Sequence, residues 1–217
     1  MSEAVRSILG RAPVVPVITI NTIDEAVPLA RALVAGGIPV LEITLRTVHG
    51  LEAIRRIRAE VEGAVVGAGT VLTGTDLDNA IAAGSEFIVT PGLTDPLLRA
   101  GAECGVPFLP GIATVSELMR CLEHDQRTLK FFPAEAAGGA KTLKAFAGPF
   151  PGVAFCPTGG ISLANMADYL AVPSVLSIGG SWLTPEPLIA AQDWSAITAL
   201  AREACERVRA LRPAASQ

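Results

Sequence analysis

The feature that most constrains the fold of this chain is a regular alternation of short apolar runs with longer amphipathic stretches. Short apolar runs bounded by turn residues are typical of buried strands, whereas apolar residues at helical spacing predict helices. The apolar runs lie at residues 14–18, 40–45, 64–68, 86–89, 106–109, 128–132, 153–156 and 174–178. The helical stretches lie between them at residues 24–34, 50–61, 76–83, 95–104, 115–123, 140–147 and 163–170, and a last one occupies residues 194–211.

Strands that alternate with helices predict an α/β fold of parallel strands, because each crossover helix returns the chain to the same end of the sheet. Eight such units in 217 residues predict a single (β/α)8 TIM barrel that spans residues 1–217 as one domain. An open doubly wound sheet is the alternative, but no G-x-G-x-x-G fingerprint follows the first strand. Residues 1–10 are expected to form a short N-terminal helix that caps the barrel.

The charge and the apolar content of the chain argue against two classes of partner. The net charge is −4 and no cluster of Lys and Arg forms a basic patch, so we expect no nucleic-acid binding. The chain is 50% hydrophobic, yet no run of membrane-spanning length is free of Gly, Pro or charge. We therefore expect no membrane partner.

The cysteines indicate reduced thiols rather than disulfides or a metal centre. They are widely spaced, form no C-x-x-C pair, and are accompanied by only two histidines. Their positions are Cys104, Cys121, Cys156 and Cys205. Residues 1–10 also lack the apolar core of a signal peptide. Together these features predict a cytoplasmic protein without a metal site.

Lys130 is the most unusual polar residue, because it lies inside an apolar run between Leu129 and Phe131. The chain has only three lysines, and the other two, Lys141 and Lys144, lie in a helical stretch with an ordinary solvated interpretation. Burial disfavours an ammonium group, and a neutral amine can attack a carbonyl to form a Schiff base. The alternative is a structural lysine that reaches water or pairs with a carboxylate.

Strand alternation predicts which side chains share the barrel interior. In residues 40–46 one face carries Leu41, Ile43 and Leu45 and should pack on helices. The other face carries Val40, Glu42, Thr44 and Arg46. In residues 128–132 the same parity puts Lys130 and Phe132 on the inner face. These side chains are therefore expected near the carboxyl ends of the strands, where barrel enzymes keep their active sites. A purely structural Glu–Lys or Glu–Arg pair remains the alternative.

Loops that follow the strands add further polar groups. Thr70 ends the Gly-Ala-Gly-Thr sequence of residues 67–70 and places a hydroxyl at the mouth of the barrel. Glycine pairs follow the seventh and eighth strands, at residues 159–160 and 179–180, and they let backbone N–H groups approach a phosphate. Glu135 follows the Lys130 strand, and we interpret it as a charge at a helix N-terminus that could also touch the site.

Several longer motifs resemble one known family. They are Gly-Gly-Ile-Pro-Val-Leu-Glu-Ile-Thr-Leu-Arg-Thr at residues 36–47, Val-Gly-Ala-Gly-Thr-Val-Leu at 66–72, Val-Thr-Pro-Gly at 89–92, Pro-Gly-Ile-Ala-Thr at 110–114 and Leu-Lys-Phe-Phe-Pro-Ala-Glu at 129–135. With the two Gly-Gly loops they extend over residues 14–183. The chain closely resembles the 2-keto-3-deoxy-6-phosphogluconate (KDPG) aldolases, a family that also includes 4-hydroxy-2-oxoglutarate (KHG) aldolases.

The resemblance implies a class I aldolase that needs neither a metal nor a cofactor. It implies that Lys130 forms the Schiff base, that Glu42 is the general acid and base, and that Arg46 and Thr70 hold the pyruvate carboxylate. It further implies that Pro91 and Phe132 wall the pyruvate pocket, that Thr158 lies by the substrate chain, and that Gly159, Gly160, Gly180 and Ser181 bind the phosphate.

The resemblance also implies the reaction and its partners. The expected substrate is a 2-keto-3-deoxy sugar acid, 2-dehydro-3-deoxy-6-phosphogluconate, which a homotrimer of the Entner-Doudoroff pathway would cleave to pyruvate and D-glyceraldehyde 3-phosphate. Residues 19–22 lack a basic residue that some relatives carry, so cleavage of 4-hydroxy-2-oxoglutarate to pyruvate and glyoxylate, or of the 6-phosphogalactonate epimer, stays open. Two alternatives of other classes are a phosphate-binding barrel isomerase or synthase without imine chemistry and a non-catalytic binding barrel.

Overall fold

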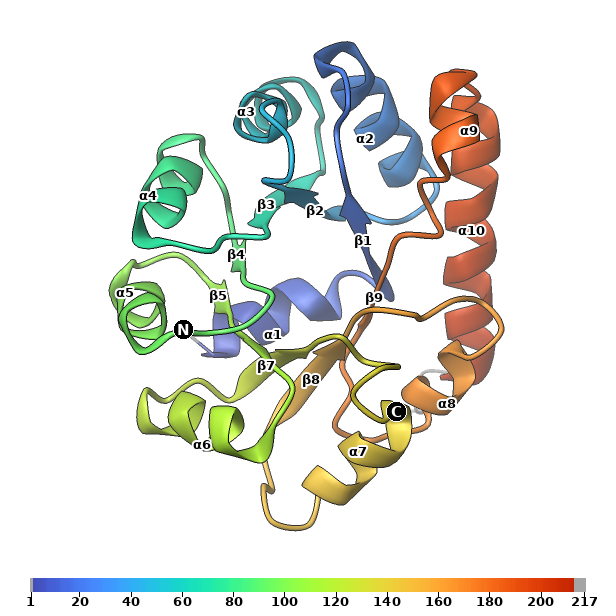
Figure 1. Cartoon of the computed structure of the whole chain (residues 1–217). Coiled ribbons are helices and arrows are strands. Elements are labelled where there is room, and N and C mark those ends of the chain that lie inside the picture. Colours follow the sequence, from blue (N-terminus) through green and yellow to red (C-terminus); the bar gives the residue numbers. More distant parts are fainter. Residues whose placement is uncertain (1, 213–217) are drawn as a thin grey trace.

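The computed structural model describes residues 2–212 and consists of parallel strands with helices between them (Figure 1). The strands are β1 (Val14–Ile18), β2 (Val40–Thr44), β3 (Val65–Gly69), β4 (Ile88–Val89), β5 (Phe108–Leu109), β6 (Gly111–Ile112), β7 (Thr128–Phe131), β8 (Ala154–Pro157) and β9 (Ile178–Gly180). The helices are α1 (Ser2–Gly10), α2 (Ala26–Ala35), α3 (Gly50–Glu60), α4 (Gly74–Ala82), α5 (Asp95–Glu103), α6 (Val115–Glu123), α7 (Gly139–Phe146), α8 (Met166–Leu170), α9 (Glu186–Ala190) and α10 (Trp194–Leu211), with the 3-10 turn η1 (Ile23–Glu25) before α2.

The strands form two parallel sheets. One has the order β5-β4-β3-β2-β1-β9, and the other has the order β6-β7-β8. Isolated parallel bridges join Phe155 to Val175 and Thr158 to Gly179, so β8 also contacts the segment of β9. In Figure 1 the strands lie around a common centre, with α2 to α7 and α10 outside them. The predicted α/β fold of parallel strands is confirmed.

Several elements differ from the predictions. The fifth strand, expected at residues 106–109, is two short strands separated by Pro110, which has no N–H group for a ladder hydrogen bond. The eighth, expected at residues 174–178, forms its ladder at Ile178–Gly180 instead. The pattern does not predict α9, whose five residues are too few for helical periodicity.

The helix expected at residues 1–10 is present as α1, although Met1 lies outside the described residues. Val5 and Leu9 of α1 are buried in one cluster with inward-facing strand residues. Those strand residues are Val15, Val40, Val65, Val89, Leu109 and Cys156, and Phe87 just before β4 is buried with them. Because Val40 and Val65 begin β2 and β3, α1 covers the amino-terminal ends of the strands, as Figure 1 also shows.

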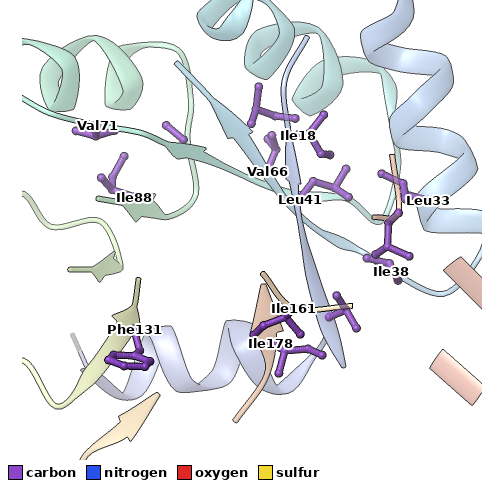
Figure 2. Packing of buried hydrophobic residues seen from close by; sticks show 14 of the residues in the cluster. Ile18, Leu33, Ile38, Leu41, Val66, Val71, Ile88, Phe131, Ile161 and Ile178 are labelled. Atoms are coloured by element: carbon purple, nitrogen blue, oxygen red, sulfur yellow. The ribbon is translucent and has the colours of Figure 1, made fainter. Parts of the chain in front are cut away.

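A second, larger core lies between the strands and the outer helices (Figure 2). Leu41 and Ile43 of β2 belong to it together with Leu33 of α2, whereas Val40 belongs to the inner cluster. This division confirms the predicted parity of β2, and it leaves Glu42 on the inner face. No helix within residues 2–212 combines the length and the apolar character that a bilayer crossing needs.

Candidate active site

Glu42 and Lys130 meet in the interior of the strands. The Lys130 Nζ atom donates to the Glu42 Oε1 atom at 3.0 Å, and the two side chains are only 5% and 4% exposed. β2 and β7 belong to different sheets, so the two side chains reach each other across the interior rather than along a ladder. The proximity that strand parity predicts is therefore present, as a buried pair of opposite charges whose members depend on each other.

Glycine on β3 provides the space for this pair. A Cβ atom at Gly69 would collide with the carboxylate of Glu42, and one at Gly67 would lie 2.5 Å from the ring of Phe87. Both glycines are inward positions of β3, since Gly67 is in register with Glu42 and Gly69 with Thr44. The Gly-Ala-Gly sequence is thus a packing requirement of the site.

Two further side chains surround the amine of Lys130. The Nζ atom lies 5.5 Å from the centre of the Phe132 ring, a favourable position for a cation. Cys156 is the partner of Lys130 in the β7–β8 register. Burial raises the pKa of the Cys156 thiol to about 12, although the Lys130 charge partly offsets this effect. The thiol therefore stays protonated and does not compete with the amine as a nucleophile.

Arg46 and Thr70 meet at the exposed rim of the strands. Arg46 Nε donates to Thr70 Oγ1 at 3.2 Å, and Arg46 is exposed. Thr70 has φ of +58°, a left-handed conformation that is unfavourable for a side chain with a branched Cβ. Such backbone strain is concentrated at functional sites. The guanidinium is open to solvent and available to a carboxylate ligand.

Pro91 is brought to the site by the turn after β4. A Cβ atom at Gly111 would lie 2.5 Å from the carbonyl oxygen of Pro91, and Thr90 Oγ1 accepts from the Gly111 N–H group at 3.1 Å. Gly111 is the register partner of Lys130 in the β6–β7 ladder. The structure therefore places Pro91 one strand away from the lysine.

The two glycine-pair loops lie next to each other. Thr158 is buried and bridges to Gly179, where a Cβ atom would collide with the Thr158 hydroxyl. Gly159 and Gly160 have φ of +103° and +77°, which explains why these positions need glycine. Gly180 packs against the ring of Trp182 beside Ser181.

The sequence patterns do not single out two residues that hold the first of these loops. Asn165 and Tyr169 contact the segment of Gly160 and Glu135, and Glu135 precedes α7 rather than forming its first turn. The interpretation of Glu135 as a charge at a helix N-terminus is therefore wrong. The spacing of Ser162 and Asn165 just before α8 is the one signal that could have indicated a capping contact.

A cavity of ≈ 320 Å³ lies beside Ser181. It is lined by Val17, Thr19, Asn21, Ser181, Thr184, Glu186 and Ile189. These lining residues include a carboxylate but no Lys or Arg, which agrees with the absence of a basic residue after the first strand. Within the described part of the chain, no group of three or more His, Cys, Asp or Glu side chains is arranged to hold a metal ion.

Comparisons with known proteins give one consistent answer. A family model described as "Aldolase: KDPG and KHG aldolase" matches residues 5–200. The "2-dehydro-3-deoxy-phosphogluconate aldolase" of Dickeya dadantii is 58% identical over 197 residues, which cover 91% of this chain and 92% of that protein. The "KHG/KDPG aldolase" of Escherichia coli K12 is 57% identical over 200 residues, which cover 92% of this chain and 94% of that protein.

Solved structures agree with the sequence comparisons. The KDPG aldolase of Legionella pneumophila, with pyruvate captured as a covalent carbinolamine intermediate, has a TM-score of 0.90 and 46% identity over 92% of this chain and 97% of that one. The 2-keto-3-deoxy-6-phosphogluconate aldolase of Zymomonas mobilis ZM4 with 3-phosphoglycerate has a TM-score of 0.90 and 48% identity over 94% of this chain and 96% of that one.

Proposed function

This chain belongs to the KDPG and KHG aldolase family, and we propose on that basis that it cleaves 2-dehydro-3-deoxy-6-phosphogluconate to pyruvate and D-glyceraldehyde 3-phosphate through a Schiff base on Lys130. Membership of the family makes the protein an aldolase, a lyase. The observation that carries the residue assignment is the buried contact between Lys130 Nζ and Glu42 Oε1. The pyruvate carbinolamine of the Legionella relative supports the same chemistry.

The first steps form the imine. A proton passes from the Lys130 ammonium to Glu42, which leaves a free amine beside a neutral carboxylic acid. The amine attacks the C2 carbonyl of the substrate, and exchange of protons through Glu42 gives the neutral carbinolamine. Glu42 then protonates the carbinolamine hydroxyl, water leaves, and an iminium remains beside a Glu42 carboxylate.

The next steps break the carbon–carbon bond. The Glu42 carboxylate takes the proton of the C4 hydroxyl, the C3–C4 bond breaks, and the iminium accepts the electron pair as an enamine. The aldehyde leaves, and Glu42 returns its proton to C3. Hydrolysis of the new iminium releases pyruvate and restores the Lys130–Glu42 pair. A single carboxylate suffices because each step returns the proton that an earlier step removed.

Residues around the pair bind the rest of the substrate in this proposal. Arg46 and Thr70 hold the carboxylate at the rim, where their hydrogen bond already aligns them. The substrate chain and phosphate are assigned to a second set of residues: Phe132 and Pro91 wall the pyruvate, Thr158 lies by the chain, and Gly159, Gly160, Gly180 and Ser181 bind the phosphate. The 3-phosphoglycerate of the Zymomonas structure supports a phosphate ligand in this family.

A closed (β/α)8 barrel is part of the proposal. Only Pro110 separates β5 from β6, and parallel bridges link β8 to the β9 segment. These contacts support a closed ring in which β5 and β6 together are the fifth strand. We also propose that residues 1–217 form one domain, of which the structure describes residues 2–212. The four free thiols support the cytoplasm as its location.

A homotrimer is the proposed assembly. Apolar side chains are exposed after three of the strands, where a second copy could cover them. They are Val48 after β2, Leu72 after β3, and Val115 and Met119 on α6 after β6, and Val48 is 92% exposed. Sedimentation of the purified protein tests the assembly, with the mass of three chains as the expected result.

Cleavage of 4-hydroxy-2-oxoglutarate is the second candidate function. The cavity beside Ser181 contains Glu186 and no basic side chain, so phosphate would be bound by backbone N–H groups without a cation. A site of this kind accepts an unphosphorylated substrate more readily than one built around a fixed positive charge. The E. coli relative bears both names.

A retro-aldol panel with pyruvate release as the readout tests the function. The substrates are 2-dehydro-3-deoxy-6-phosphogluconate, its 6-phosphogalactonate epimer and 4-hydroxy-2-oxoglutarate. The largest kcat/KM is expected for the phosphogluconate derivative. Equal cleavage of 4-hydroxy-2-oxoglutarate would contradict the primary substrate, and no pyruvate from any of the three would contradict the function itself.

A further inference from the structure

The 158–162 loop has a backbone that needs external support. Its two glycines are in left-handed conformations, with φ of +103° at Gly159 and +77° at Gly160. Glycine loses more conformational freedom on ordering than any other residue, so an unsupported loop of this kind would bind a ligand only after being ordered at a cost in free energy. The contacts that fix the loop therefore bear on ligand affinity.

Two backbone contacts hold the first part of the loop. The N–H group of Ala134 donates to the Thr158 carbonyl at 2.8 Å, and the N–H group of Glu135 donates to the Gly159 carbonyl at 3.0 Å. The Glu135 side chain also lies against Gly160. A Cβ atom added at Gly160 would be 2.7 Å from the Cβ atom of Glu135. Lys130 lies on β7, and the segment that follows β7 is thus bonded directly to the 158–162 loop.

Asn165 holds the second part. Its Nδ2 atom donates to the Gly160 carbonyl at 3.0 Å, and its Oδ1 atom accepts from the Ser162 N–H group at 2.8 Å. Both ends of the amide are used, one as a donor and one as an acceptor. An aspartate could not supply the donor, and an alanine supplies neither group.

Tyr169 of α8 completes the support by holding Glu135. The Tyr169 hydroxyl donates to Glu135 Oε1 in a short hydrogen bond, and Tyr169 is fully buried. Burial, together with the neighbouring Glu135 carboxylate, raises the pKa of Tyr169, so the hydroxyl remains a donor. This contact fixes a carboxylate that would otherwise be free to turn toward an anion bound at the loop.

These contacts determine where the N–H groups of the loop point. In a planar trans peptide the carbonyl of one residue and the N–H group of the next point in opposite directions. Because the carbonyls of Thr158, Gly159 and Gly160 face their donors, the N–H groups of Gly159, Gly160 and Ile161 face away from them. The Thr158–Gly179 bridge places the Gly159 N–H group opposite the Gly179 carbonyl, whereas among the described residues no backbone acceptor takes the N–H groups of Gly160 and Ile161. Two free N–H groups on consecutive residues form a site for an anion.

We propose that Asn165, Glu135 and Tyr169 are positioning residues that set the preference for a phosphorylated substrate by aiming the N–H groups of Gly160 and Ile161 at the phosphate. The inference rests on the proposed function, because it assigns the phosphate to this loop. The inference attributes part of the phosphate affinity to residues that support the loop and do not themselves touch the phosphate. The Lys130–Glu42 chemistry is independent of it.

The test compares two substrates that differ only in the phosphate, 2-dehydro-3-deoxy-6-phosphogluconate and 2-dehydro-3-deoxygluconate, with the wild type and Asn165→Ala. The variant is expected to raise KM for the phosphorylated substrate about tenfold, with kcat and the kcat/KM for the unphosphorylated one within about twofold, because only a hydrogen-bonded support is lost. The inhibition constant of inorganic phosphate should rise by the same factor. Asn79→Ala, which changes an exposed asparagine of α4, is the control and should change nothing.

Tyr169→Phe is the second variant, and it keeps the test decisive should Asn165→Ala fold poorly. It leaves the ring in the core and removes the hydroxyl, so KM for the phosphorylated substrate should again rise selectively. Variants that affect both substrates equally, or neither, overturn the inference while the aldolase function stands. A wild-type enzyme that cleaves both substrates equally well and is not inhibited by phosphate overturns the phosphate site, and the inference with it.

Discussion

The two ends of the interior that the strands enclose differ in the polarity of their side chains. At the amino-terminal end, Val5 and Leu9 of α1 pack with Val15, Val40 and other apolar side chains in a buried cluster. At the carboxyl-terminal end the interior holds the Lys130–Glu42 pair and opens to a rim of polar groups. On β2 the change occurs within two residues of one face, between Val40 and Glu42.

This difference indicates that stability and chemistry are placed in separate layers of the same strands. Apolar burial at one end contributes free energy that the buried charges at the other end do not supply, since a buried ion pair at best compensates its own desolvation. Changes at the carboxyl end should therefore affect catalysis first, and changes at the amino-terminal end should affect stability first. The five predictions below test that separation, from the largest expected effect to the smallest.

Lys130→Met removes the nucleophile while it keeps a side chain of similar length. We expect kcat to fall by at least about 10⁴-fold, since no other group can form the imine. Pyruvate release measures the loss, and Lys144→Met, on the exposed face of α7, is the control.

Lys130→Arg separates imine chemistry from electrostatics. The guanidinium keeps the charge beside Glu42 but cannot form a Schiff base. An aldolase loses its activity with this change. Appreciable activity in Lys130→Arg would favour an isomerase or synthase in which Glu42 acts as a base without an imine.

Glu42→Gln keeps the shape of the side chain and removes its proton transfer. The expected loss in kcat is about 10²-fold to 10⁴-fold, the size of a general acid–base contribution. Rapid-quench measurement of the single turnover locates the affected step. A change confined to KM would show that Glu42 only binds the substrate.

Leu9→Ala tests the amino-terminal end of the strand interior. Leu9 is 1% exposed, so the truncation should lower the free energy of unfolding by about 2–5 kcal/mol through lost burial and a cavity. Urea denaturation measures this change, with the partly exposed Leu211→Ala as the control. The kcat of the folded variant should equal that of the wild type, and a matching loss of activity would argue against separate layers.

Thr114→Ala has the smallest expected effect, at the cap of α6. Thr114 and Glu117 form a capping box, and loss of such a cap costs about 1 kcal/mol.

Partial burial alone would raise the pKa of Glu117, but hydrogen bonds from Ala113 and Thr114 outweigh it and lower that pKa below 4.5. A lowered carboxyl pKa contributes stability that is present above the unfolded value and is lost as pH falls through the folded value. The stability difference between wild type and variant should therefore shrink below pH 4.5, and a difference that grows there would contradict the capping role.

The residues that sequence reasoning brought together are those on strands. Alternation along β2 and β7 determines the faces of Glu42 and Lys130, so their meeting in the interior could be predicted without coordinates. Asn165 and Tyr169 could not be found this way. Their contacts depend on how the five-residue helix α8 packs on a loop of left-handed glycines, and periodicity carries no information about such a short element.

Sequence periodicity also did not predict the interruption of the fifth strand. Residues 106–109 have the apolar content of a strand, but Pro110 interrupts the ladder, and the chain resumes pairing only at Gly111. The apolar pattern identified the fifth β/α unit and its place in the order of strands. The bend that brings Gly111 against Pro91 and into register with Lys130 follows from backbone geometry instead.

The most direct test of the central claim is borohydride trapping with pyruvate, followed by peptide mapping in a mass spectrometer. Reduction of the imine should add the pyruvate-derived group to one lysine of the wild-type protein. The account predicts the adduct on the peptide that contains Lys130, and none in Lys130→Met. An adduct on Lys141 or Lys144, or no adduct in the wild type, would contradict it.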